Sequence, residues 1–255
     1  PTDRRRKICS SLIKEIIPVA ASALVMNFVS FVDLMTVPRT LKALFVSNSG
    51  YFSARLAEIL PSAGGIDGLP NFMYGSYTGI AMTMFMLIPS FAGMTEKTSI
   101  PEIAAAWQQR DLDNTVKSCC TLFRASAVIG FPACIGAAVL AEPLLSMLYS
   151  GRAAEVSVCS GAFAVLCTGG LFMIVAFQAI GKAHIPLVLM CFSVALKAIL
   201  NPVLMSVPQL NICGAALATS ACYIMVALTG SVILRRELRG KISVFSCVCR
   251  PLISS

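Results

Sequence analysis

Six long apolar stretches limit what this chain can fold into. Each has about 20 residues, which is enough for an α-helix to cross the roughly 30 Å apolar core of a bilayer. Inside lipid the backbone polar groups must be hydrogen-bonded within the segment itself, so such stretches form helices. The predicted spans are Ile16–Met35, Phe72–Met94, Ser118–Leu140, Val156–Ile180, Ala183–Met205 and Ile212–Leu234.

The composition agrees with a chain whose surface is largely in contact with lipid. Charged residues make up 13% of the 255 positions and hydrophobic residues 57%, and the mean hydropathy is +0.81. A soluble domain carries roughly a quarter charged residues. We therefore predict an all-α integral membrane protein. It has a basic cytoplasmic segment at residues 1–11, a transmembrane lobe at 12–240 and the start of a further helix at 241–255.

The net charge of +8 does not indicate a nucleic-acid partner, because the basic residues lie between the apolar stretches and form no common face. Most of the 20 Lys and Arg residues fall on one side of the membrane if the N-terminus is cytoplasmic. Cytoplasmic connections are enriched in these residues. We therefore predict a multi-pass protein of the cytoplasmic membrane, with the lipid bilayer as its partner and its N-terminus inside.

One connection is predicted to form a helix on the cytoplasmic surface of the membrane, at residues 99–114. It opens with Ser99-Ile100-Pro101-Glu102, which has the spacing of a capping box with an early proline. Apolar and charged residues then alternate at helical spacing, and the sequence contains its only tryptophan here, Trp107. We expect Trp107 and Glu102 to anchor and position this helix at the interface.

Lys197 lies in the middle of the span 183–205, where a charged side chain costs about 2.5–3.5 kcal/mol to insert. Asn201 follows four residues later and so shares its helix face. Two interpretations are open for Lys197. It either faces a wet cavity and attracts an anionic headgroup, or it is a structural cation paired with an acid or carbonyl group of a neighbouring helix.

Two further spans carry polar residues that are candidates for the same cavity. Asp33 lies near the outer end of its span, where it either pairs with Arg39 or binds a coupling proton or Na⁺ ion. Asn27 faces another side of that helix, and a hydrogen bond to a neighbouring helix is its simplest role. Gln178 either lines the cavity or marks a helix end before Gly181.

The sequence contains little material for catalysis. It has no glycine-rich phosphate loop of the Walker type, and a single histidine is poor material for a hydrolase triad or a metal site. Most of the eleven cysteines lie in or beside apolar stretches, where cysteine behaves as a small hydrophobic residue. We therefore predict no enzyme activity, no catalytic residue, no metal and no cofactor.

Several short motifs appear in the order and spacing of a known transporter family. Asp33–Arg39 contains an aspartate followed by Val-Pro-Arg, and Tyr74–Met82 contains Tyr-Gly followed by Gly-Ile-Ala-Met. Through these motifs the chain resembles the C-terminal half of the multidrug/oligosaccharidyl-lipid/polysaccharide exporter superfamily. It is most similar to the stage V sporulation protein B and polysaccharide-biosynthesis flippases, which are related to the lipid II flippases. The remaining motifs are Ser99–Ile103, Gly130–Ala133, Ala141–Leu144, Leu148–Gly151, Gln178–Lys182 and Gly214–Thr219.

This resemblance implies a six-helix lobe of a two-lobed, MATE-like transporter from a bacterial cell envelope. Its partner would be a missing N-terminal lobe, and its substrate an undecaprenyl-linked saccharide or a peptidoglycan precursor. Because the chain starts without Met and ends as another apolar segment begins, we expect a fragment of a longer flippase that works by alternating access. The alternatives are a cation-coupled multidrug antiporter and a membrane scaffold that does not transport.

Overall fold

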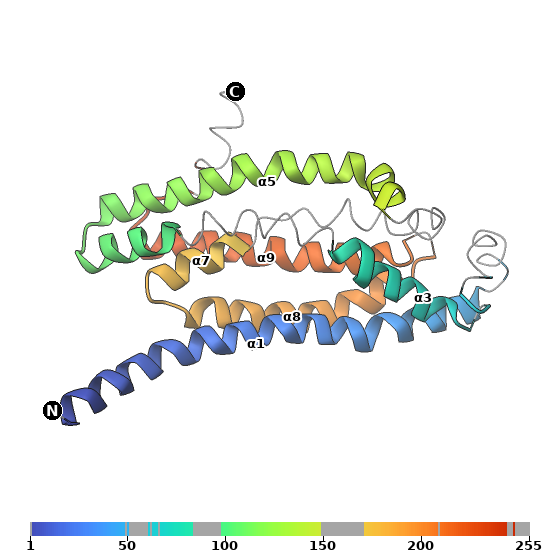
Figure 1. The fold of residues 1–255 in the computed structure, drawn as a ribbon, viewed down its shortest axis with the longest axis horizontal. Helices are drawn as coiled ribbons and strands as arrows, with labels where there is room; N and C mark the ends of the chain where they lie inside the picture. Colours follow the sequence, from blue (N-terminus) through green and yellow to red (C-terminus); the bar gives the residue numbers. More distant parts are fainter. Residues whose placement is uncertain are drawn as a thin grey trace.

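The computed structural model describes residues 2–48, 50, 61, 63–65, 67–83, 98–148, 171–208, 210–243 and 247. These residues form helices joined by turns, and no strand occurs among them. Figure 1 shows the long helices lying side by side as a bundle, with their axes roughly along one direction. The all-helical class predicted from the apolar stretches is therefore confirmed for the described part of the chain.

Three helices form the layer that positions the candidate site. Helix α1 spans Thr2–Ser47, α8 spans His184–Met205 and α9 spans Cys213–Glu237. α8 packs along α1 on one side and along α9 on the other (Figure 1). Among the described residues, α8 and α9 are the two helices long and apolar enough to cross a membrane.

The outer face of α8 is apolar. Val188, Phe192, Ile199 and Val203 recur at intervals of four or seven residues, and each is more than half exposed. This spacing places them on one face of the helix. A contiguous exposed apolar face is rare on a soluble monomer, whereas lipid stabilises it. The inner and outer faces of α8 therefore differ as expected for a helix at the lipid boundary.

The other helices cover this layer. α3 spans Leu69–Ser76 and continues directly into a π-helical turn, η1, at Tyr77–Ala81. α5 spans Leu112–Leu148 and α7 spans Leu171–Ala179. At one end of the bundle, α5, α7, α9 and the helical residues 98–108 share a buried apolar cluster. Its members include Ile103, Leu122, Phe123, Met173, Phe177, Leu234 and Leu238.

The predicted interfacial helix ends earlier than expected, at residue 108. Arg110 adopts a left-handed backbone with φ of 57°, which a helix interior does not allow. Asp111 then caps α5, because its Oδ1 accepts the backbone N–H of Asn114 at 3.0 Å. This hydrogen bond is the main reason that the pKa of Asp111 lies below its usual value of 3.8. The region 99–114 therefore holds two helices with a capped turn between them.

Both residues expected to position this segment contact α5 or the apolar cluster. Trp107 is half-buried and packs against the cluster. The exposed Glu102 accepts a hydrogen bond from Ser118 Oγ of α5 at 2.7 Å. In the same region Cys120 of α5 forms a disulfide with Cys247.

The turn between α8 and α9 depends on one glycine. A Cβ atom on Gly214 would lie 2.8 Å from the carbonyl carbon of Leu204 and 2.8 Å from the backbone nitrogen of Met205. Both are backbone atoms, so they cannot yield by a simple change of rotamer. Glycine at this position therefore allows the start of α9 to approach the end of α8.

The apolar stretches predict some helices more closely than others. The spans 183–205 and 212–234 coincide with α8 and α9 to within three residues at each end. The spans 16–35 and 118–140 lie inside the longer helices α1 and α5, and α1 also includes most of the basic segment 1–11. The span 72–94 begins in α3 and η1, but its residues after 83 are outside the described part. Residues 156–170 of the fourth span and most of 241–255 also lie outside the described part.

Candidate functional site

The buried face of α8 carries a row of polar side chains. Ser193, Lys197 and Asn201 follow one another at intervals of four residues, and all three are buried. This spacing aligns them on one helix face, between α1 and α9. Cys222 of α9 donates its Sγ–H to the carbonyl oxygen of Ser193 at 3.4 Å. α8 therefore presents lipid-compatible residues outward and a polar row inward.

Lys197 forms a buried ion pair with Asp33 of α1. The distance from Lys197 Nζ to Asp33 Oδ2 is 2.7 Å, and the two residues are 1% and 6% exposed. Asn201 Nδ2 donates to the other carboxylate oxygen, Asp33 Oδ1, at 2.9 Å, and also to Thr36 Oγ1 at 2.9 Å. Both oxygens of Asp33 are thus engaged by α8. Such a pair connects two helices that are distant in sequence.

The environment of Lys197 distinguishes between the two interpretations drawn from the sequence. Its ammonium group is buried and lies 2.7 Å from a carboxylate of a neighbouring helix, which is the pairing that the second interpretation predicts. A protein tolerates two buried charges when they compensate each other and are hydrogen-bonded by the groups around them. The buried ammonium donates a hydrogen bond to Asp33 Oδ2.

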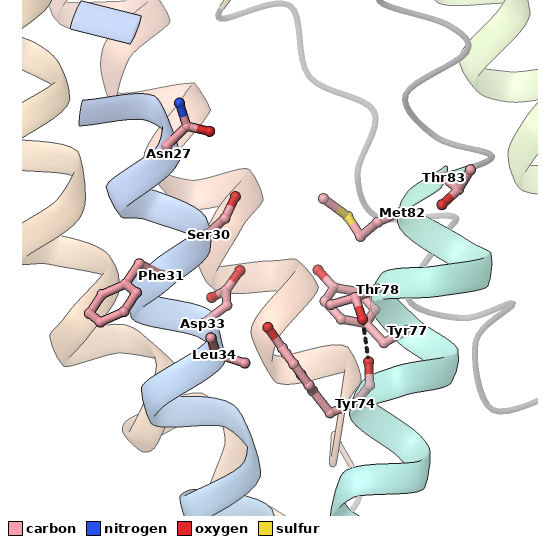
Figure 2. Close-up of a pocket in the computed structure, with 10 residues that line it drawn as sticks. All are labelled: Asn27, Ser30, Phe31, Asp33, Leu34, Tyr74, Tyr77, Thr78, Met82 and Thr83. Carbon is pink, nitrogen blue, oxygen red and sulfur yellow. Dashed lines mark hydrogen bonds between the residues drawn. The ribbon is translucent and has the colours of Figure 1, made fainter. Parts of the chain in front are cut away.

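A groove lies on the other side of Asp33, between α1 and the α3–η1 segment. Its volume is about 680 Å³. Figure 2 shows the two helices facing each other, with Asp33 on one wall and the ring of Tyr74 extending toward it from the other. The lining residues are Asn27, Ser30, Phe31, Asp33, Leu34, Tyr74, Tyr77, Thr78, Met82 and Thr83. Five of these ten residues carry a hydroxyl group, none of the ten is Lys or Arg, and most of the surface that they expose to the groove is apolar.

The π-helical turn shapes the second wall of the groove. In a regular α-helix, the face of Tyr74 and Thr78 would continue near position 81. In η1 the backbone N–H of Met82 instead bonds to the carbonyl of Tyr77, five residues earlier. The groove is accordingly continued by Met82 and Thr83. Single π turns are rare and occur frequently at functional sites.

The predicted site residues are only partly brought together. Asp33 and Asn27 line the same groove, although Asn27 was predicted to face another side of α1. Lys197 and Asn201 lie behind Asp33 and are not among the described lining residues. Arg39 is exposed further along α1, and the two oxygens of Asp33 bond to α8 and not to this guanidinium. Gln178 is half-buried near the end of α7, where its backbone carbonyl oxygen accepts the backbone N–H of Gly181 at 3.1 Å.

The described residues offer no evident metal centre. No group of three or more His, Cys, Asp or Glu side chains lies close enough together among them to hold a metal ion. Among the ten described lining residues Asp33 is the one carboxylate, and it is already hydrogen-bonded by Lys197 and Asn201. The arrangement is therefore a partly apolar recess that contains hydroxyl groups and an acid paired with a cation.

Comparison with protein families identifies the class of transporter. A family model described as lipid II flippase MurJ matches residues 81–249. This match covers more than half of the chain. The chain belongs to the MurJ lipid II flippase family. No curated protein and no solved structure shows significant similarity to it.

The MurJ family is a family of flippases, a class of membrane transporter, and its members are bacterial inner-membrane proteins. This confirms the superfamily resemblance read from the motifs. The matched region contains α5, α7, α8 and α9, and therefore Lys197 and Asn201. Asp33 and Tyr74 precede it. The ion pair thus joins the MurJ-matched region to α1.

Sequence reasoning did not select the hydroxyl residues of the groove. Ser30, Thr78 and Thr83 are common residue types in helices, and nothing in their local spacing indicates a site. Tyr74, Tyr77 and Thr78 lie in the motif Tyr74–Met82 that carried the MurJ-related resemblance. That motif was the sequence feature that could have pointed to these groove residues, although it did not reveal that α3 and η1 face α1 across a groove.

Proposed function

We propose that this chain forms one lobe of a flippase that moves a lipid-linked precursor of the cell wall across the cytoplasmic membrane by alternating access. The substrate class is an undecaprenyl-linked saccharide or peptidoglycan precursor, as lipid II is for the family. The observation that carries the proposal is a groove at the α1–α3 interface that contains hydroxyl and amide side chains, in a protein in which the outer face of α8 is apolar. Family membership supports the same class of cargo.

The physical requirement for such a transporter is a polar route beside an apolar wall. The saccharide and phosphate groups of the cargo must stay solvated or hydrogen-bonded, because unsatisfied polar groups are costly in hydrocarbon. The lipid tail can remain in the bilayer. The groove supplies hydroxyl and amide groups for the first task. The exposed face of α8, with Phe192 and Ile199, is compatible with the second.

The orientation that we propose places the N-terminus of the chain in the cytoplasm. The segments predicted to lie inside gather at one end of the bundle, where α1, α5 and α8 begin and α9 ends (Figure 1). Lys182 pairs there with Glu237, and Lys241 pairs with Asp113 at 2.6 Å. A second, N-terminal lobe of the same protein would face this one and complete the passage.

One feature of the groove favours a second candidate, a cation-coupled multidrug antiporter. Asp33 and the rings of Tyr74 and Tyr77 are groups that attract organic cations. The carboxylate is, however, 2.7 Å from the Lys197 ammonium, which offsets its charge. A lipid-linked saccharide is therefore the better fit to this recess.

The test is translocation by the full-length transporter in liposomes. A fluorescent lipid-linked precursor is loaded, and its movement between leaflets is followed by its accessibility to a quencher. We expect Ser30→Trp, which fills the groove, to reduce the translocation rate at least tenfold. Ser47→Trp is the matched control, since Ser47 is an exposed serine of α1 that does not line the groove.

Three other results would contradict the proposal. Equal translocation rates for Ser30→Trp and Ser47→Trp would show that the groove is not part of the transport route. Efflux of an organic cation such as ethidium, without movement of the lipid-linked precursor, would favour the antiporter. A correctly folded wild-type protein that moves neither the organic cation nor the lipid-linked precursor would indicate a scaffold that does not transport.

A further inference from the structure

We infer that the groove between α1 and the α3–η1 segment recognises the saccharide of the lipid-linked cargo and not its pyrophosphate. This inference rests on the proposed flippase function and adds which part of the cargo this site reads. The basis is the chemistry of the ten lining residues and the position of the one charged group among them.

The lining is rich in groups that pair with sugar hydroxyls. Ser30, Tyr74, Thr78 and Thr83 bring hydroxyl groups to the groove, and Asn27 brings an amide. A hydroxyl donates one hydrogen bond and accepts others, and an amide does both through separate atoms. A saccharide has this same mixture of donors and acceptors around its rings. A neutral polyol therefore matches the groove without any charge compensation.

Thr78 illustrates how the groove is prepared to accept hydrogen bonds. Its Oγ1 donates to the carbonyl oxygen of Tyr74 at 2.9 Å, one helical turn earlier (Figure 2). The hydrogen of this hydroxyl is thereby directed at the backbone, and the lone pairs of the oxygen remain for a donor in the groove. Tyr74 itself is half-buried, with its ring extending across the groove. The two side chains are neighbours on one face and form a polar edge beside an aromatic surface.

The charges near the groove disfavour a pyrophosphate. Phosphate groups in proteins are held by Arg, Lys or helix N-termini, and none of the ten described residues that line this groove is Lys or Arg. Lys197 lies nearby, but it is 1% exposed and its ammonium bonds to Asp33 Oδ2. The charged group that reaches the groove wall is the Asp33 carboxylate, whose charge Lys197 offsets, so this wall offers a phosphate no net positive charge. The pyrophosphate must therefore be bound elsewhere in the transporter.

The size of the groove is consistent with a saccharide ligand. Its volume of about 680 Å³ falls within the range of roughly 300–1,000 Å³ found for small-molecule sites. The π turn extends the lining to Met82 and Thr83, so the polar edge continues along the wall beyond a single helical turn. A groove of this length gives a ring-shaped ligand several contacts.

The experiment compares two ligands that differ only in the saccharide. A short-chain polyprenyl pyrophosphate that bears a saccharide and the same polyprenyl pyrophosphate without it are bound to the purified full-length transporter. Affinities are measured by native mass spectrometry. Thr78→Val and Tyr74→Phe remove one groove hydroxyl each with little change of shape. Thr40→Val is the matched control, because Thr40 is a half-buried threonine of α1 outside the groove.

We expect each groove substitution to weaken binding of the saccharide-bearing ligand about two- to tenfold, the usual effect of one lost hydrogen bond. Binding of the saccharide-free ligand should stay unchanged, and Thr40→Val should affect neither. Thr78→Ser keeps the hydroxyl and should bind the saccharide-bearing ligand nearly as well as the wild type.

Each contrary result has a distinct meaning. Equal weakening of both ligands, or of neither, would overturn the assignment of the groove to the saccharide while leaving the flippase proposal in place. An equally large loss for Thr78→Ser and Thr78→Val would show that the effect is structural and would also overturn it. A wild-type protein that binds neither ligand would overturn the proposed function together with this inference.

Discussion

The buried ion pair between α1 and α8 gives the sharpest quantitative prediction. Lys197 and Asp33 lie 2.7 Å apart, with side chains that are 2% and 9% exposed. The perturbation removes the charges one at a time and then together, as Lys197→Gln, Asp33→Asn and the double variant. Gln and Asn keep the approximate volume and can hydrogen-bond each other. The comparison therefore isolates charge from packing.

Breaking a buried ion pair by removing one partner typically costs about 3–5 kcal/mol, because the remaining charge is left without compensation. For Lys197→Gln we expect about 3 kcal/mol, since Asn201 still donates to Asp33 Oδ1. For Asp33→Asn we expect a cost toward 5 kcal/mol. Among the described residues, Asp33 is the one carboxylate paired with the ammonium of Lys197.

The double variant should lie within about 1 kcal/mol of the wild type. Replacing a buried ion pair as a whole by neutral groups of similar volume is often neutral or stabilising. Its cost should therefore be much smaller than the sum of the two single costs. The free energy of unfolding is measured by denaturant titration of the full-length protein in detergent micelles, alongside its steady-state amount in membranes.

Additive costs would refute this reasoning. If the double variant were destabilised by the sum of the single effects, Lys197 and Asp33 would not be compensating each other. The double variant also separates structure from transport. A stable double variant with wild-type translocation would show that the pair holds α1 to α8, whereas a stable variant without translocation would show that the charges take part in alternating access.

Three further predictions concern the framework around the site. Gly214→Ala should destabilise the fold by about 1–3 kcal/mol, because its Cβ would overlap backbone atoms at the end of α8; thermal unfolding in detergent measures this. In protein purified under oxidising conditions and denatured without reductant, Cys120 and Cys247 should resist maleimide labelling, and both should be labelled after treatment with dithiothreitol. Because the folded state lowers the pKa of Asp111, its capping contribution should be present above pH 3.8, the usual value, and be lost as the pH falls further; carboxyl NMR titration follows the group directly.

Each of these predictions has its own control. Gly79→Ala is the counterpart of Gly214→Ala, because a Cβ there meets nothing within 4 Å. Equal effects of the two would contradict the close approach of α8 and α9. Labelling of either cysteine before reduction would contradict the disulfide. An Asp111→Asn variant should lose the acid-dependent part of stability, and an unchanged pH profile would exclude the cap as its source.

The sequence alone determined the class of the molecule and several helix positions. Apolar stretches of about 20 residues have one stable form in lipid, so α8 and α9 were predicted to within three residues at each end. Helical spacing also placed Lys197 and Asn201 on the same face, and the structure buries both. These inferences succeeded because they depend on the local periodicity of one segment.

The tertiary structure decided what these residues face. Asp33 and Lys197 are 164 positions apart, and no local pattern shows that α1 packs beside α8 and supplies the counter-charge. The sequence left Lys197 open between a cavity cation and a structural one, and Asp33 open between Arg39 and other roles. Helix packing decided the partner of each charge, because a buried charge is tolerated when an opposite charge lies in direct contact: Lys197 and Asp33 pair with each other. The groove likewise exists only once α1 and α3 lie together, since each contributes one wall.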